Sequence, residues 1–228
     1  MTTKFKKGKF IVIEGVDGSG KGTQVALLAD YLKNHKKHFE IADFPQYYNF
    51  SGAFVAKYLR GEYGTADEVG PYRGSIFYAV DRYDKSFDIK KWLKEGKNVI
   101  ANRYASANMG HQAGKIHNKK SRDLFLNWVS NLEYKIFGIP KPDMTIFLYV
   151  TPEIGHKLVG KKSARKYIKG KNRDIHEEDL NHLKRASEAF LYVAKKYNWE
   201  IINCAPKGEM RTREDIHKDI LKKLNRVI

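Results

Sequence analysis

The chain has 228 residues, and 43 Lys plus Arg against 26 Asp plus Glu give it a formal net charge of +17. Hydrophobic residues make up 42% and charged residues 30%, which excludes a disordered chain and indicates one folded domain over residues 1–228. A single cysteine, Cys204, excludes an internal disulfide framework. No apolar run approaches the roughly 20 residues needed to span a bilayer. We expect a cytoplasmic protein without a membrane partner.

The positive charge predicts affinity for polyanions of some kind, such as nucleic acid, an anionic surface or small phosphorylated molecules. The basic residues are dispersed, with local clusters near residues 4–9, 33–37 and 157–173. They are accompanied by no aromatic-interleaved repeat and no zinc-finger spacing. We therefore expect no specific nucleic-acid partner.

Short apolar runs alternate with helical patterns along the chain. We predict strands at Lys9–Glu14, Phe39–Asp43, Asn98–Ala101, Met144–Val150 and Glu200–Asn203. The predicted helices are Lys21–Asn34, Gly52–Arg60, Tyr72–Lys94 with an interruption near Asp84, Ser121–Phe137, Asp174–Tyr197 and Arg213–Asn225. This alternation indicates an α/β fold with a five-stranded parallel sheet covered by helices on both faces.

A glycine-rich segment, GVDGSGKGTQ, joins the first predicted strand to the first predicted helix. In that context glycines let successive backbone N–H groups point at phosphate oxygens, and the helix N-terminus adds a favourable dipole. Lys21 would reach the β- and γ-phosphates of a nucleotide. The predicted phosphate-binding residues are Gly15, Val16, Asp17, Gly18, Ser19, Gly20, Lys21, Gly22 and Thr23. Gly22 stands where the usual motif has a Ser or Thr that binds magnesium, so Mg²⁺ has to be held by other groups.

The GKGTQ form of this loop is similar to that of adenylate kinases, and several further blocks resemble the thymidylate kinase family from Phe10 to about Ile220. The resemblance implies that Asp17 contacts the acceptor sugar and, through water, the magnesium ion. In the block DFPQY it implies that Phe44 and Tyr47 lie near the acceptor. In the block IFYAVDR it implies that Phe77 stacks on thymine and that Arg82 hydrogen-bonds the base.

The block NRYASANMGHQ resembles the Asp-Arg-Tyr segment of that family. Arg103 matches the residue that clamps the acceptor phosphate, for which a guanidinium fork is suited. Asn108, His111 and Gln112 are implied acceptor-binding residues. Asn102 replaces the family's Asp, and His111 replaces the Tyr or Phe that excludes a ribose 2′-hydroxyl. Because an Asp would offer a charged acceptor to magnesium-bound water, the pattern predicts that Asn102→Asp raises activity at limiting Mg²⁺.

A basic segment at about residues 160–174 is similar in place and charge to the family's lid over the phosphates. The phosphate loop carries no arginine, so Arg165 and Arg173 are the candidate catalytic arginines, beside Lys21, Arg103 and Asp17. A charge run alone would more often be a solvated loop; the position of this one favours a role for at least one arginine.

The resemblance implies a P-loop kinase fold, ATP as phosphoryl donor, Mg²⁺ as cofactor, dTMP as acceptor and a homodimer. The expected reaction is transfer of a phosphoryl group from ATP to dTMP, giving dTDP and ADP. Two alternatives stay open at this point. One is a kinase for another pyrimidine monophosphate such as dUMP, and the other is a catalytically weak P-loop protein that binds nucleotides or polyanions.

Overall fold

A computed structural model describes residues 7–159 and 180–227 and contains a five-stranded sheet in the order β2-β3-β1-β4-β5. The strands are β1 (Phe10–Gly15), β2 (Phe39–Asp43), β3 (Asn98–Asn102), β4 (Met144–Tyr149) and β5 (Glu200–Asn203). All four neighbouring strand pairs are parallel. The α/β class, the five strands and their parallel arrangement are therefore confirmed.

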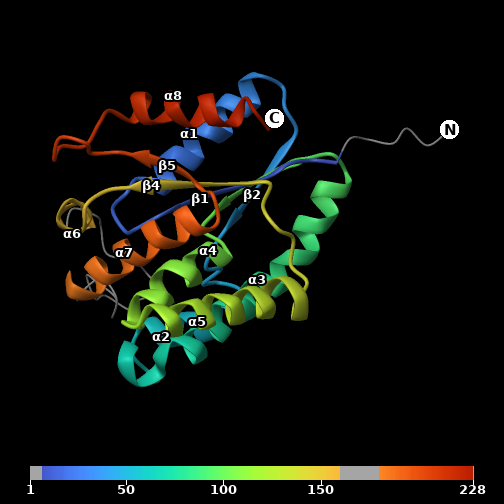
Figure 1. Ribbon diagram of the computed structural model, residues 1–228. Coiled ribbons are helices and arrows are strands. Elements are labelled where there is room, and N and C mark those ends of the chain that lie inside the picture. Colours follow the sequence, from blue (N-terminus) through green and yellow to red (C-terminus); the bar gives the residue numbers. More distant parts are fainter. Residues whose placement is uncertain (1–6, 160–179, 228) are drawn as a thin grey trace.

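Helices cover both faces of this sheet (Figure 1), with α1 and α8 on one face and α3, α4, α5 and α7 on the other. The helices are α1 (Lys21–Asn34), α2 (Ala53–Leu59), α3 (Ala66–Lys94), α4 (Ala105–Ala107), α5 (Lys119–Asn131), α6 (Pro152–Val159), α7 (Leu180–Lys196) and α8 (Arg213–Leu224). Shorter turns are the 3₁₀ segments η1 (Phe50–Gly52) and η3 (Ala113–Lys115) and the π-helical segments η2 (Asn108–Gln112) and η4 (Leu132–Ile136).

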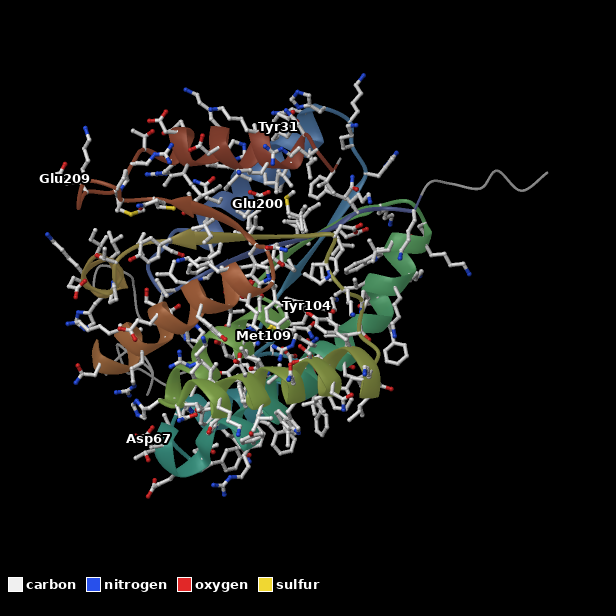
Figure 2. All side chains as sticks on the ribbon, in the orientation of Figure 1. Tyr31, Asp67, Tyr104, Met109, Glu200 and Glu209 are labelled. Atoms are coloured by element: carbon white, nitrogen blue, oxygen red, sulfur yellow. The ribbon has the colours of Figure 1, made fainter. Side chains whose placement is uncertain are left out.

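The core is divided by the central strand, because successive side chains of a strand point to opposite faces. Ile11 and Ile13 of β1 belong to the apolar cluster that includes α1 and α8, whereas Phe10 and Val12 pack with β3 and the end of α3. Tyr104, which follows β3, is fully buried beside Phe10 with ring centroids 4.9 Å apart. Figure 2 shows Tyr104 and Met109 in the interior, between the sheet and the helices of this second face.

The boundaries of α3 differ from the prediction. The helix begins at Ala66 because Thr65 and Glu68 form a capping box. The break in its backbone lies at Gly70, which has φ 71° and ψ 172° and precedes Pro71. No break occurs near Asp84, where the helix is continuous. The prediction of an interruption there was wrong.

The segments Ala105–Lys115 and Pro152–Val159 are helical, which the pattern did not predict. The predicted lid, its two arginines and the start of the helix predicted from Asp174 lie outside the described residues. Cys204 is buried and unpaired, as expected for an inert thiol, and burial raises its pKa to about 12. No helix within residues 7–159 and 180–227 is long and apolar enough to cross a membrane.

Candidate active site

The loop between β1 and α1 has the backbone of a phosphate-binding loop. Gly18 and Gly20 have φ values of 81° and 87°, the left-handed region that glycine adopts without strain. A Cβ at Gly18 would lie 2.3 Å from the carbonyl oxygen of Gly155, so only glycine fits there. The ammonium of Lys21 donates to the carbonyl oxygens of Gly15, at 2.8 Å, and Val16, at 2.9 Å. The loop therefore holds its lysine at the start of α1.

A cavity of about 540 Å³ opens beside this loop, a size typical of small-molecule sites. It extends from the loop to the end of α4, the segment η2 and α3. The predicted residues that line it are Asp17, Gly18, Gly20, Lys21, Gly22, Phe44, Tyr47, Arg82, Arg103, Asn108, His111 and Gln112. Of the predicted phosphate-binding set, Gly15, Val16, Ser19 and Thr23 are absent from the lining; Val16 and Ser19 are buried beneath the loop, and Thr23 is exposed.

Arg103 joins the acceptor side of the cavity to the phosphate loop. It follows the end of β3 with φ 65°, a conformation that costs free energy for a non-glycine residue and that the surrounding contacts must offset. Its guanidinium forms an ion pair with Asp17 and lies 2.9 Å from Nε2 of His111. Burial disfavours its charge, but the carboxylates of Asp17 and Glu14 hold its pKa above the ordinary value. Arg103 is thus a fixed cation between the two halves of the cavity.

The side chain of Phe77 does not line the cavity, which corrects the prediction that it stacks on a base. Phe77 packs against α2, where its ring centroid lies 5.8 Å from that of Tyr58 and 6.1 Å from that of Phe54. The neighbouring residue, Tyr78, lines the cavity together with Arg82. Residues four apart lie on the same helix face, so Tyr78 is the aromatic side chain placed beside Arg82.

Arg82 is 2% exposed and Glu133 is completely buried, and their side chains form a two-point ion pair. Burial disfavours the charge of Arg82, but the Glu133 carboxylate offsets this and raises its pKa above the ordinary value. Asn108 donates from Nδ2 to the backbone oxygen of Ser75 at 3.0 Å and to Glu133 at 3.3 Å. The end of the cavity distant from the loop is therefore lined by a fixed cation and a fixed amide.

Asp43, at the end of β2, is a cavity residue that the sequence analysis did not select. Its Oδ1 accepts a hydrogen bond of 2.8 Å from Nδ2 of Asn102. Burial raises the pKa of the Asp43 carboxyl. A carboxylate thus lies beside the position where the family pattern expects one, on the neighbouring strand.

Magnesium fits this donor set in a limited way. The carboxylates of Asp17 and Asp43 are the acidic side chains of the described residues that line the cavity. The part of the chain that the structure describes holds no cluster of three or more metal-ligating side chains. Mg²⁺ commonly retains several waters and binds through one or two carboxylates plus substrate phosphates, which agrees with these residues. Asp17, or Asp43 through water, would hold it.

Glu14 and Glu133 are two further buried acids that the sequence analysis missed as site residues. Glu14 accepts hydrogen bonds from the Gly15 amide, at 2.9 Å, and the Ser106 hydroxyl, at 2.7 Å, and lies 3.8 Å from Arg103. A sequence signal for both was available, namely a charged residue in an otherwise apolar pattern. Glu14 follows four apolar residues in β1, and Glu133 comes four residues after Val129 on the same helical face.

The chain has a parallel sheet, a phosphate loop after β1 and a cavity lined by an arginine after β3. Together these features define a P-loop kinase of the nucleoside monophosphate class. The sequence model of thymidylate kinase matches residues 13–218. The chain is 30% identical over 227 residues to the thymidylate kinase of Plasmodium falciparum (isolate 3D7), covering 100% of this chain and 94% of that protein. The chain belongs to the thymidylate kinase family.

Two other comparisons agree with this assignment. The thymidylate kinase of Danio rerio is 26% identical over 215 residues, covering 94% of this chain and 89% of the relative. A solved structure of thymidylate kinase from Candida albicans superimposes with a TM-score of 0.74 at 21% identity, covering 96% of this chain and 92% of that chain. At that identity the structural likeness supports the fold alone.

Proposed function

We propose that the protein transfers the γ-phosphoryl group of ATP to dTMP, giving dTDP and ADP. The observation that carries this proposal is the single cavity that joins the phosphate loop to a base-sized end lined by Tyr78, Arg82 and Asn108. Phosphoryl transfer needs the two substrates in line and the negative charge of the transferred group neutralised. One continuous cavity with cations at its middle and at its loop end meets both needs.

Each cation has a distinct position in this scheme. Lys21 lies at the loop, where it would leave the Gly15 and Val16 carbonyls to meet the donor phosphates. Arg103 would exchange its contact with Asp17 for the acceptor phosphate, and Asp17 then becomes available to the acceptor sugar. Mg²⁺ supplies charge neutralisation at the donor phosphates when bound. Arg165 and Arg173 remain our candidates for completing the site.

The base end of the cavity supports a pyrimidine acceptor. Tyr78 offers an aromatic face, and Arg82 and Asn108 offer polar groups toward the base edge. Phe44, Tyr47, His111 and Gln112 complete the walls around the acceptor. We infer that these residues hold dTMP with its phosphate toward Arg103.

The proposal is tested with a coupled assay that follows ADP release from ATP and Mg²⁺ in the presence of dTMP, dUMP, UMP or CMP. We expect turnover that is fastest with dTMP. Lys21→Met should reduce turnover by at least about 100-fold, because it removes a charge that stabilises the transferred group, while calorimetric dTMP binding stays near wild type. Binding of ATP without phosphorylation of any of these acceptors would contradict the enzymatic function.

We further propose a homodimer formed through α3, in a protein of the cytoplasm. Five apolar side chains recur every three or four residues on one face of this helix and are 37–58% exposed: Tyr72, Ile76, Val80, Tyr83 and Phe87. A continuous apolar face of a long helix fits against the same face of a second copy across a two-fold axis. The free, buried thiol of Cys204 agrees with a reducing compartment.

A further inference from the structure

Glu133 lies behind the base end of the cavity and touches both polar side chains there. It is 0% exposed and is supplied by the π-helical segment η4. Its two oxygens accept from Nε of Arg82 at 3.1 and 3.2 Å, and Oε1 also accepts from Nη2. Oε1 lies 3.3 Å from Nδ2 of Asn108 as well. One carboxylate therefore connects two groups that line the cavity from α3 and η2.

The contact with Arg82 determines which of its donors remain for a ligand. A guanidinium carries five N–H groups on three nitrogens. Nε and Nη2 bond to Glu133, so Nη1 is the nitrogen that these bonds leave available on the cavity side. Because two nitrogens of the guanidinium, Nε and Nη2, donate to the same carboxylate, the plane of the guanidinium is fixed as well.

The contact with Asn108 determines the direction of its amide. Nδ2 has two N–H groups, and they are directed to the Ser75 carbonyl oxygen and to Glu133. Both of these partners are acceptors only, so a reversed amide would place its carbonyl oxygen against a carbonyl and a carboxylate. The carbonyl oxygen Oδ1 is consequently the atom of Asn108 left for a ligand in the cavity.

We propose that Glu133 is a positioning residue that selects 4-oxo over 4-amino pyrimidines. Through Arg82 it presents a donor, and through Asn108 it presents an acceptor. Thymine and uracil carry the complementary pair, an O4 acceptor next to an N3–H donor, whereas cytosine carries a 4-amino donor next to an N3 acceptor. This inference rests on the proposed function, since it assumes that the cavity holds a pyrimidine monophosphate.

The first test compares dTMP and dCMP binding to wild type and Glu133→Gln by calorimetry, which needs no turnover. A carboxamide has one acceptor oxygen where Glu133 has two. With its oxygen in the place of Oε2, its N–H groups face both Arg82 and Asn108; with its oxygen in the place of Oε1, they face Nε of Arg82. We expect dTMP affinity to fall by about 10- to 100-fold and the dTMP:dCMP affinity ratio to fall at least tenfold. ATP affinity should stay within about twofold, which also shows that the variant is folded.

Two matched variants separate positioning from stability. Glu133→Asp keeps the charge on a shorter side chain, and we expect its dTMP:dCMP ratio to fall below that of wild type but less than that of Glu133→Gln. If Glu133→Gln does not fold, the fall of the Glu133→Asp ratio below wild type is the test. Asp219→Asn removes a carboxylate that holds a guanidinium outside the cavity, that of Arg211 at 2.8 Å. It should leave the ratio unchanged.

The second test is whether Glu133 acts through Asn108. In an Asn108→Ala background, the amide that Glu133 orients is absent, so adding Glu133→Gln should change the dTMP:dCMP ratio much less than it does in wild type. An unchanged ratio in both Glu133 variants, or full effects of the two substitutions that simply multiply, would overturn the proposal. Wild-type protein that binds dTMP normally but does not phosphorylate it would instead overturn the proposed function.

Discussion

Tyr78 and Phe77 are adjacent aromatic residues with opposite surroundings, and they give the sharpest prediction at the scale of the residue. Base–aromatic stacking contributes about 1–3 kcal/mol, which corresponds to about 5- to 150-fold in affinity. We expect Tyr78→Ala to raise the KM for dTMP within that range and leave the KM for ATP unchanged. Phe77→Ala is the matched control, expected to lower the Tm by removing contacts to Tyr58 with little change in the KM for dTMP. The reverse pattern in initial-rate measurements would contradict this assignment.

Asp43 links stability to pH. Burial raises the pKa of its carboxyl in the folded protein. Between the ordinary and the raised pKa the native state binds more protons than the unfolded chain, so the stability contributed by this group falls as the pH rises through that window. Asp43→Asn removes this desolvated charge, and we expect a Tm above wild type at pH 7. The difference should shrink as the pH approaches the ordinary Asp pKa of about 4 in calorimetric scans; a constant difference would exclude this cause.

Asn102 is the partner of Asp43, and the structure reverses the effect expected of its replacement. The sequence pattern favours higher activity for Asn102→Asp at limiting Mg²⁺. However, Asn102 lies 2.8 Å from the Asp43 carboxylate, so two carboxylates would come within hydrogen-bond distance and one would bind a proton in preference to a metal. We expect a lower initial rate than wild type at every Mg²⁺ concentration. A higher rate at limiting Mg²⁺ would restore the first expectation.

At the scale of the element, the π-helical segment η2 places Asn108 and Gln112 on the cavity through its fit against α7. A Cβ at Gly110 would lie 2.3 Å from the Phe190 ring, and overpacking of this kind costs about 1–3 kcal/mol. We expect Gly110→Ala to lower the Tm by about 3–10 °C and to raise the KM for dTMP, because η2 is displaced.

Gly22→Ala is the stability control for this prediction. Nothing lies within 4 Å of the added Cβ at Gly22, and its φ is not positive, so thermal unfolding should be near that of wild type. A Gly110→Ala protein with unchanged Tm and unchanged KM for dTMP would show that η2 does not depend on this close approach to α7.

At the scale of the whole molecule, two faces of α3 have different surroundings. One of its faces presents Tyr78 and Arg82 to the cavity, and another carries the exposed apolar side chains that we propose as a dimer interface. Val80→Asp places a charge in the centre of that apolar face. We expect light scattering after size-exclusion chromatography to change from the mass of a dimer to that of a monomer. Leu124→Asp, on an exposed site of α5, should leave the mass unchanged; a monomeric wild type would contradict the dimer.

The sequence determined most of the secondary structure and the loop end of the site. The glycine pattern around Lys21 and the five apolar runs are local signals, because each depends on neighbours within a few residues. The block around Arg103 and Asn108 was selected through its resemblance to a family motif, and both residues line the cavity. These features required no knowledge of long-range contacts.

Only the tertiary structure decided which aromatic residue faces the cavity and what stands behind it. Consecutive helical residues point about 100° apart, so an apolar segment with Phe77 and Tyr78 does not by itself reveal which one turns inward. The ion pairs Asp17–Arg103 and Arg82–Glu133 join residues 86 and 51 positions apart, and no local pattern encodes a partner at such a distance. A buried charge requires a compensating partner, and the fold brings that partner from another element.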